Sequence, residues 1–291
     1  MYKVVRHHSE NKITIEKNNE LVACILQNHG GILQKLILDG KDIIDGSNIN
    51  GSNQFFKNSI LFPFTGRITD GKYTFENKSY QLEKNEPYSN NALHGLVFNQ
   101  IFDLVSVKEE EEKAEISLSY KSNGCSGYPF PYSMNITYII KEKTINFIVK
   151  ITNIGEDTMP FGIGWHPYFK IQDSYSTKIQ LNSRKKYITN NRLVPIDYTE
   201  TNNMVDIKID DNKFDESYLL SSDNILITTG DYQLRMKIIN GDNNNYLHIY
   251  TPSEKNSVAI EPLTCTANVF NNENGLQLLK SNEEYNWGVQ L

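Results

Sequence analysis

The chain has 291 residues, a formal net charge of −6 and three cysteines. Its length allows a large hydrophobic core, and its negative charge argues against a nucleic acid or an anionic membrane as partner, because neutralising phosphates requires a concentrated basic face. No run is long and apolar enough for a membrane helix, and the polar start argues against a secretory signal. The cysteines (Cys24, Cys125 and Cys265) are odd in number and widely spaced, so we expect no disulfide framework. A reducing cytoplasm is the expected location.

Short runs in which apolar and polar residues alternate follow one another along the chain, and helical periodicity is scarce. Clusters of Gly, Asn and Asp separate these runs, as turns do between strands. The pattern predicts an all-β fold, a large antiparallel β-sandwich. No linker-like segment or repeat of fixed period divides the chain, so residues 1–291 are expected to form a single domain. The runs expected as strands cover residues 12–16, 21–26, 32–38, 73–82, 101–107, 115–120, 134–140, 145–151, 225–228, 234–239, 247–250 and 258–260.

The first candidate site residues lie in two loops. An apolar run ends in the pair Gly66-Arg67, and arginine offers a planar fork of N–H donors that suits a sugar hydroxyl or a carboxylate. His94 follows a polar loop, residues 85–91, that is long enough to wrap a cleft. Taken singly, Arg67 also fits a surface arginine, and His94 with Gly95 also fits an ordinary turn.

The segment 161–169, Phe-Gly-Ile-Gly-Trp-His-Pro-Tyr-Phe, is the most informative stretch. If the alternation of the preceding run continues, Gly162, Gly164 and His166 share one face of a strand, and the imidazole stands beside a strip without side chains. Strand glycines are often tolerated where a ligand or another backbone approaches closely, and Pro167 keeps His166 extended. A buried structural histidine near a bulge is the alternative interpretation.

Two acidic residues in the C-terminal part of the chain are further candidates. Glu261 ends an expected strand, and Pro262 restricts its backbone. A carboxylate held in this way is well placed to act as a general base, although a solvated glutamate at a sheet edge is the commoner case. Asp215 is expected in a loop between strands and is uninformative without the other residues.

Together these residues resemble the motifs of one known family, the aldose 1-epimerase (galactose mutarotase-like) family. The resemblance spans most of the chain, and the run Trp-His-Pro-Tyr-Phe is its most specific part. The family's best-known members have Asn before the arginine and a second glycine after the His-Gly pair. This chain has Gly66 and Leu96 there, so it is more similar to a bacterial, less characterised branch. The matching motifs are Phe62-Pro63, Gly66-Arg67-Ile68, His94-Gly95, Gly164-Trp165-His166-Pro167-Tyr168-Phe169, Phe214-Asp215 and Glu261-Pro262.

The resemblance implies a β-supersandwich that interconverts the α and β anomers of a free aldohexose such as glucose or galactose. A base takes the C1 hydroxyl proton while an acid protonates the ring oxygen, and the ring then closes on the other face of C1. By resemblance His166 is the acid, with a pKa near the ordinary value of about 6.5, and Glu261 is the base. We expect the two to flank the pyranose from opposite sides. His94 would contact the ring oxygen or a neighbouring hydroxyl, and the sugar-binding residues would be Arg67, Asp215, Trp165 and Tyr168.

No redox step occurs in this reaction, and the sequence shows no strand–Gly-rich–helix unit, so we expect no cofactor. The expected partner is a small sugar, and the chain could be a monomer or a homodimer. His94, His166 and Glu261 would also match a zinc ligand set, although their spacing does not demand a metal. The remaining histidines are expected to be structural or exposed: His7, His8, His29 and His248.

Three other functions stay open at this point. A hexose-6-phosphate 1-epimerase would use the same acid and base but needs a cationic phosphate site, for which Arg184, Lys185, Lys186 and Arg192 are available. A glycosidase or lyase would need two carboxylates, and only Asp215 with Glu261 could supply them. A sugar-binding protein without activity would keep the pocket without the catalysis.

Overall fold

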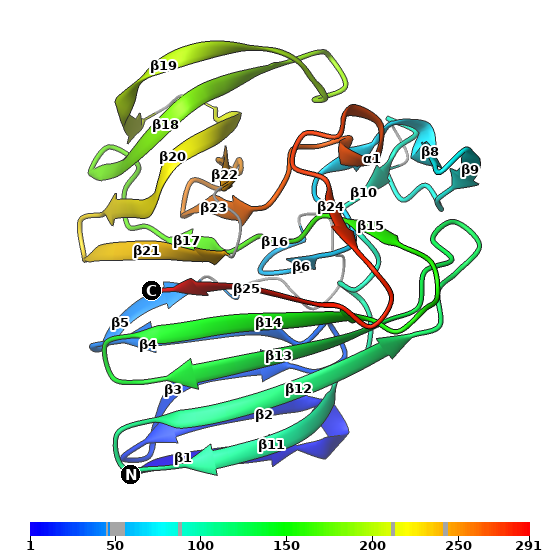
Figure 1. Ribbon diagram of the computed structural model, residues 1–291. Helices are drawn as coiled ribbons and strands as arrows, with labels where there is room; N and C mark the ends of the chain where they lie inside the picture. The colour runs from blue at the N-terminus through cyan, green and yellow to red at the C-terminus, as the bar shows by residue number, and fades with distance from the viewer. Residues whose placement is uncertain (45, 47–55, 87–88, 211–212, 241–243) are drawn as a thin grey trace.

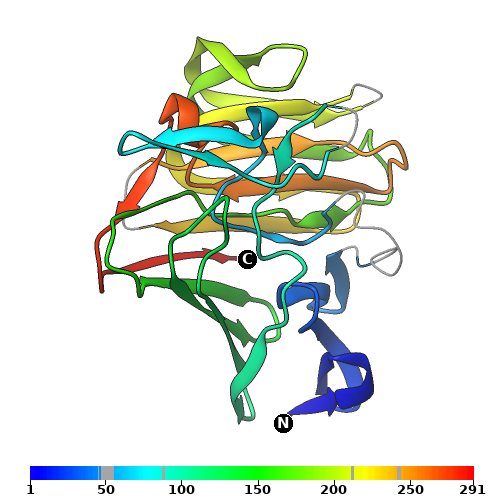
Figure 2. The ribbon, with the colours of Figure 1, turned by 90° about the vertical axis from the view of Figure 1, so that its right-hand side faces the viewer.

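The computed structural model describes residues 1–44, 46, 56–86, 89–210, 213–240 and 244–291. Within these residues the chain consists mainly of strands that pair antiparallel in two layers, so the predicted all-β sandwich is confirmed (Figure 1 and Figure 2). The helices in these ranges are short: η1 (His8–Glu10), η2 (Thr69–Gly71) and α1 (Val269–Asn272). No helix in the described part of the chain is long and apolar enough to cross a membrane.

The first layer joins the N-terminal strands to strands from the second half of the chain. It contains β1 (Tyr2–His7), β2 (Lys12–Lys17), β3 (Glu20–Leu26), β4 (Ile32–Leu38), β5 (Lys41–Ile44), β17 (Tyr168–Lys170), β22 (Tyr246–Tyr250) and β23 (Ser257–Leu263). These strands pair in the order β1–β2–β3–β4–β5–β17–β23–β22. The segments that carry His166 and Glu261 therefore lie inside this layer.

The second layer contains β11 (Asp103–Glu109), β12 (Ala114–Ser122), β13 (Tyr132–Ile140), β14 (Ile145–Asn153), β20 (Asp215–Thr228), β21 (Gln233–Asn240) and β25 (Glu284–Gln290). Its strands pair in the order β11–β12–β13–β14–β25–β21–β20. β20 belongs to both layers, because residues 224–228 pair with β21 whereas residues 215–219 pair with β22. The hairpin of β18 (Thr177–Thr189) and β19 (Pro195–Ile209) pairs with β20 and arches over the top of Figure 1.

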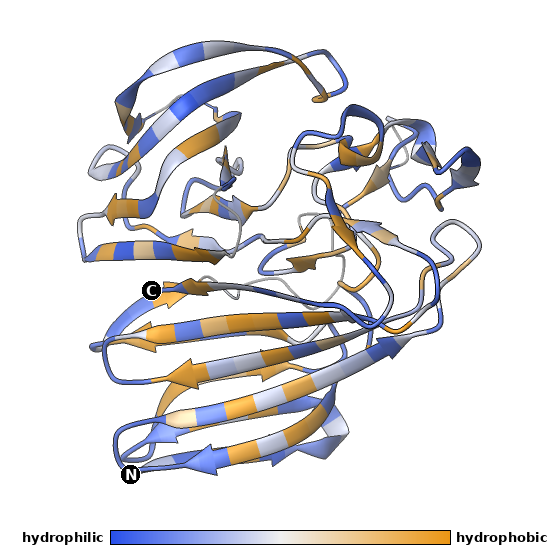
Figure 3. Cartoon of the chain, viewed as in Figure 1, coloured by the Kyte–Doolittle hydropathy of each residue, from blue (hydrophilic) through white to orange (hydrophobic). Residues whose placement is uncertain are grey.

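The hydrophobic core fills the space between the layers. Alternate residues along β12, β13 and β14 are buried, as the alternating pattern predicts. Figure 3 shows hydrophobic residues alternating with more polar ones along these strands. The Tyr138 hydroxyl on β13 donates a hydrogen bond of 2.8 Å to the carbonyl of Gly31, which precedes β4 in the other layer. The Phe147 ring on β14 packs against the Trp165 ring at a centroid distance of 5.2 Å. Segment 161–169 is therefore anchored in the core on one of its faces.

The alternating pattern does not predict every strand. β19 exposes side chains on both faces over most of its length, so it shows no alternation. The run 73–82 forms two strands, β8 (Lys72–Phe75) and β9 (Lys78–Gln81), because Glu76 and Asn77 adopt positive φ and reverse the chain. The remaining short strands are β6 (Ile60–Leu61), β7 (Arg67–Ile68), β10 (Ala92–Leu93), β15 (Met159–Phe161), β16 (Gly164–Trp165) and β24 (Gln277–Leu279).

Candidate active site

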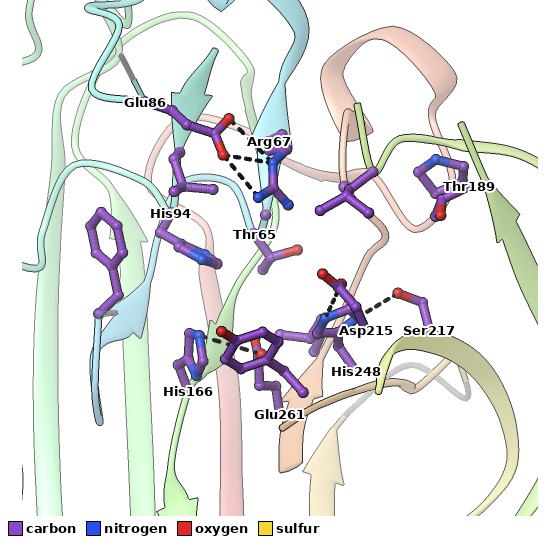
Figure 4. Close-up of a pocket in the computed structure, with 18 of the residues that line it drawn as sticks. Thr65, Arg67, Glu86, His94, His166, Thr189, Asp215, Ser217, His248 and Glu261 are labelled. Atoms are coloured by element: carbon purple, nitrogen blue, oxygen red, sulfur yellow. Dashed lines mark hydrogen bonds and ion pairs between the residues drawn. The ribbon is translucent and has the colours of Figure 1, made fainter. Parts of the chain in front are cut away.

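A pocket of about 890 Å³ lies where β7, β10, the β18–β19 hairpin and strands β20, β22 and β23 meet (Figure 4). This volume falls within the range of small-molecule sites, roughly 300–1,000 Å³. The side chains of His166 and Glu261 are only 6% and 3% exposed, so they form the floor of the pocket. The predicted site residues that line it are Arg67, His94, His166, Tyr168, Asp215 and Glu261.

His166 and Glu261 are neighbours on adjacent strands. β16 and β17, which lie on either side of His166 in the sequence, both pair with β23 in the same register. That register places His166 opposite Glu261, and the imidazole Nε2 lies 3.4 Å from the carboxylate Oε1. The expectation that the two groups stand on opposite sides of a pyranose is therefore wrong. They lie side by side, because one sheet carries both.

His248, which the sequence does not indicate as a site residue, continues this row of side chains. It lies opposite Glu261 in the β22–β23 pairing and opposite Ser217 in the β20–β22 pairing. Its Nδ1 is 2.8 Å from the Ser217 hydroxyl, and its Nε2 is 3.1 Å from Asp215 Oδ1. His248 is expected from the sequence to be structural or exposed, but it lines the pocket. Residues 247–250 and 258–260 are both expected as strands, but their pairing is not predicted, and it is this pairing that places His248 beside Glu261.

The contact between His248 and Asp215 decides their charges. Burial is the largest single influence and opposes a charge on both groups, but their hydrogen bond and the charges around them together outweigh it: Glu261 favours the charged His248, and Arg67 favours the charged Asp215. The pKa of His248 is therefore raised above its ordinary value, and the pKa of Asp215 is lowered. Asp215 is the first residue of β20 rather than a loop residue, so its backbone is fixed by pairing with β22. The two side chains form an imidazolium–carboxylate pair beside the floor.

The orientation of His166 is set by the segment before β6. The backbone N–H of Asn58 donates to the carbonyl of His166, and the N–H of His166 donates to the carbonyl of Ser59, each at 2.9 Å. The Asn58 side-chain oxygen accepts the N–H of Tyr168 at 3.0 Å. The Tyr168 ring stacks on the imidazole, with centroids 5.0 Å apart and planes 16° apart. Asn58 is thus a positioning residue, and nothing in the sequence around it signals this role.

Burial governs the protonation of the floor pair. It lowers the pKa of His166 to about 3 and raises the pKa of Glu261 to about 7, so the ordinary value expected for His166 is not found. The contact between them counteracts these shifts, since a carboxylate 3.4 Å from an imidazole favours the imidazolium form. The two side chains therefore titrate as a unit, and between about pH 3 and pH 7 they share a single proton. Such a pair can donate a proton at one atom and accept one at the other.

Arg67 faces the floor pair from across the pocket, already held by a carboxylate (Figure 4). Its Nε and Nη2 donate to the carboxylate of Glu86 at 3.0 and 2.8 Å. The Asn91 side-chain nitrogen donates to the same carboxylate at 2.8 Å. Glu86 belongs to the loop 85–91, of which residues 87 and 88 lie outside the described residues, and it lines the pocket with Asn85. Glu86 is thus a site residue that the motifs in the sequence do not indicate.

His94 lies next to His166, with ring centroids 5.1 Å apart, and the Phe56 ring packs against its other side at 4.8 Å. Burial lowers the pKa of His94 well below its ordinary value, so its imidazole is uncharged. Among the described residues, the Nδ1 atoms of His94 and His166 are buried and have no hydrogen-bond partner. Buried polar atoms without a partner call for an explanation, and a ligand hydroxyl in the pocket would supply one.

Trp165 lies in the core and does not line the pocket, so the prediction that it contacts the sugar is wrong. Its side chain is 0% exposed, and its Nε1 donates to the carbonyl of Asn58 at 3.2 Å. The reason is the two-residue period of extended backbone, which turns the neighbour of His166 to the opposite face. Trp165 therefore packs into the hydrophobic core on the face of the sheet opposite the pocket.

The glycines before His166 also serve packing. A Cβ on Gly162 would lie 2.2 Å from the Cys265 sulfur, and a Cβ on Gly164 would lie 2.3 Å from a methyl carbon of Leu263. Side chains from β23 and the segment that follows it therefore cover the two glycines, so the expectation that His166 stands beside an uncovered strip of glycines is wrong. Burial raises the pKa of the Cys265 thiol to about 11, so it is not a thiolate nucleophile. Within the described residues, no group of three or more His, Cys, Asp or Glu side chains is arranged to hold a metal ion.

The architecture defines the class of the protein. Similar solved structures include a galactose mutarotase-like protein from Clostridium acetobutylicum, with a TM-score of 0.82, 19% identity and coverage of 100% of this chain and 97% of that chain. Galactose 1-epimerase from Lactobacillus acidophilus NCFM has a TM-score of 0.80 and 17% identity, again with 100% and 97% of the two chains covered. The protein is thus a galactose mutarotase-like β-sandwich.

Comparison of sequences identifies the family. Residues 11–291 match the aldose 1-epimerase family. The uncharacterised protein YihR of Escherichia coli K12 is 25% identical over 238 residues, which cover 78% of this chain and 75% of YihR. The chain belongs to the aldose 1-epimerase family, as the motif resemblance indicated.

Proposed function

We propose that the protein is an isomerase that interconverts the α and β anomers of a free aldohexose. The observation that supports this proposal is the 3.4 Å contact between His166 and Glu261 on the floor of a pocket that fits a small molecule. The C1 hydroxyl oxygen and the ring oxygen of a pyranose are bonded to the same carbon. A proton donor and a proton acceptor in contact with each other can therefore reach both oxygens at once.

In this mechanism Glu261 takes the proton of the C1 hydroxyl while the His166 imidazolium protonates the ring oxygen. The bond between C1 and the ring oxygen breaks and leaves the open aldehyde. Rotation about C1–C2 presents the other face of the carbonyl to the returning hydroxyl, and the reverse proton transfers close the ring. The pair ends with the same single proton that it held at the start, so the cycle needs no exchange with solvent.

The other side chains of the pocket would hold and orient the sugar. The uncharged His94 would bond the ring oxygen or an adjacent hydroxyl, and Tyr168 keeps the His166 ring in place. The Arg67–Glu86 and Asp215–His248 pairs offer donors and acceptors on two walls, which suits hydroxyls that both give and accept hydrogen bonds.

We expect kcat/KM to depend on the protonation of the floor pair. As the pH rises through about 7, Glu261 loses the shared proton, and the rate should fall about tenfold per pH unit. Burial is the main cause of this raised pKa of Glu261; among the charges that face it, Asp215 raises the pKa further, whereas His248 and Arg67 lower it. The residual activity of Glu261→Gln should lack this alkaline limb. Initial polarimetric rates across the pH range test the prediction, and an unchanged limb in the variant would contradict it.

The charges around the pocket favour a neutral sugar over a phosphorylated one. In the described lining, Arg67 is the only Lys or Arg side chain, and it is already paired, while Glu86, Asp215 and Glu261 contribute carboxylates. The basic residues considered for a phosphate site make other contacts outside this lining: Arg184 donates to the carbonyl of Leu220, Lys185 lies over the Tyr198 ring, and Lys186 and Arg192 pair with Glu216 and Asp70.

We therefore expect kcat/KM for glucose or galactose to exceed that for the 6-phosphates by at least about tenfold, because placing like charges together in a site costs several kcal/mol. Polarimetry of the freshly dissolved α anomers, with and without the phosphate, measures this ratio. Faster turnover of the phosphates would support a hexose-6-phosphate 1-epimerase instead. Sugar binding without any acceleration would indicate a non-catalytic sugar-binding protein.

A further inference from the structure

The tip of the β18–β19 hairpin, residues 189–195, borders the mouth of the pocket and is fastened to its far side. We propose that this tip is a strap that restricts the substrate to a free monosaccharide, with Arg192 as the residue that holds it closed. The inference rests on the proposed function, since it concerns which sugars reach the floor pair.

The strap has a defined shape. The Asn190 side-chain oxygen accepts the backbone N–H of Arg192 at 2.9 Å and that of Val194 at 3.2 Å. Leu193 adopts a positive φ of 56°, and its N–H donates to the carbonyl of Asn190 at 2.9 Å. These bonds close a compact turn, so the strap is an ordered structure. Thr189, Leu193 and Pro195 face the pocket and contribute to its lining.

Arg192 joins the strap to the loop on the other side of the pocket. Its Nη2 donates to Asp70 Oδ1 at 2.9 Å, to the carbonyl of Ser89 at 3.1 Å and to the side-chain oxygen of Asn91 at 2.5 Å. A guanidinium fork held by a carboxylate and two further acceptors is a strong, directional contact. Asn91 in turn bonds Glu86, which lines the pocket. The contacts therefore run continuously from the strap to the opposite wall.

The exposure of the side chains places the strap at the end of the pocket remote from the reaction. The side chains of His166 and Glu261 are 6% and 3% exposed, whereas the strap residues that line the pocket, Thr189, Leu193 and Pro195, are only half-buried. A hexose with its anomeric carbon at the floor pair directs its C4 end toward the rim. In a 4-linked disaccharide the second ring is attached at C4, so the strap obstructs that ring but leaves room for a hydroxyl.

The test compares Arg192→Ala with the matched control Arg184→Ala. Arg184 lies on β18 of the same hairpin, is exposed, and does not line the pocket. For the unmodified protein and Arg184→Ala, we expect kcat/KM for maltose to be at least about tenfold below that for glucose, a modest cost for a group that does not fit. In Arg192→Ala this ratio should shrink about tenfold. Arg192→Lys keeps the charge but loses the fork, so it should give an intermediate ratio.

The affinities for both sugars are measured by calorimetry in parallel with the polarimetric rates. Equal glucose-to-maltose ratios in all four proteins would overturn the strap and leave the proposed function intact. If neither sugar is turned over, the proposed function fails, and the binding data alone test the strap. The strap proposal then requires that the protein binds glucose more tightly than maltose and that this difference is smaller in Arg192→Ala. Unmodified protein that binds neither sugar would contradict both proposals.

Discussion

Replacing His166 by Ala or Glu261 by Gln is expected to lower kcat for anomer interconversion by roughly 10²–10⁴-fold, the usual contribution of one positioned acid or base. The two groups hold one proton between them at a distance of 3.4 Å, so neither can complete the transfer without the other. The double variant should therefore be no slower than the more damaged single variant. The measurement is the initial polarimetric rate after subtraction of the spontaneous reaction.

Two variants serve as controls for these substitutions. Glu216→Gln alters a carboxylate next to Asp215 whose oxygens bond Lys186 and the Tyr218 hydroxyl, each at 2.6 Å, and which does not line the pocket. His29→Ala removes a histidine that is likewise not part of the described lining. Both controls should keep near-normal rates. Near-normal rates in folded His166→Ala or Glu261→Gln protein would overturn the proposed mechanism.

Trp165→Ala is expected to destabilise the fold by about 3–5 kcal/mol, as is usual when a large aromatic side chain is removed from a core. The indole is fully buried, packs against Phe147 at 5.2 Å and donates a hydrogen bond of 3.2 Å to the Asn58 carbonyl. Denaturant unfolding measures the effect. The control Tyr175→Ala removes a ring that is 64% exposed and should change stability by no more than about 0.5 kcal/mol. A Trp165→Ala protein of unchanged stability but raised KM would restore the sugar-contact interpretation.

The sequence predicts the fold well where one face of a strand is buried and the other is exposed to solvent. β12, β13 and β14 show the alternation that this environment requires. β19 does not, because most of it stands clear of the core, and no local pattern could have indicated its 15 residues. The arrangement of the strands depends on pairings between the two ends of the chain, which no window of sequence contains. That the chain forms one domain and resides in the cytoplasm stays a prediction.

The candidate site is predictable in part. The motifs that carry Arg67, His94, His166, Tyr168, Asp215 and Glu261 point to residues that meet in one pocket. The direct contact between acid and base could not be predicted from them, because it depends on the register of β16, β17 and β23. Asn58 contacts Tyr168 and Glu86 contacts Arg67, both of which are distant in the sequence. The residues next to Asn58 and Glu86 therefore give no indication of their roles.

One strand links the integrity of the pocket to that of the whole molecule. β20 carries Asp215 and Ser217 at one end and pairs with β21 of the second layer at its other end. Separating β20 from β22 would break the wall of the pocket and also part the two layers where they are joined. The pocket wall formed by β20 and β22 therefore cannot open by local unfolding alone. We expect it to open only when the whole protein unfolds.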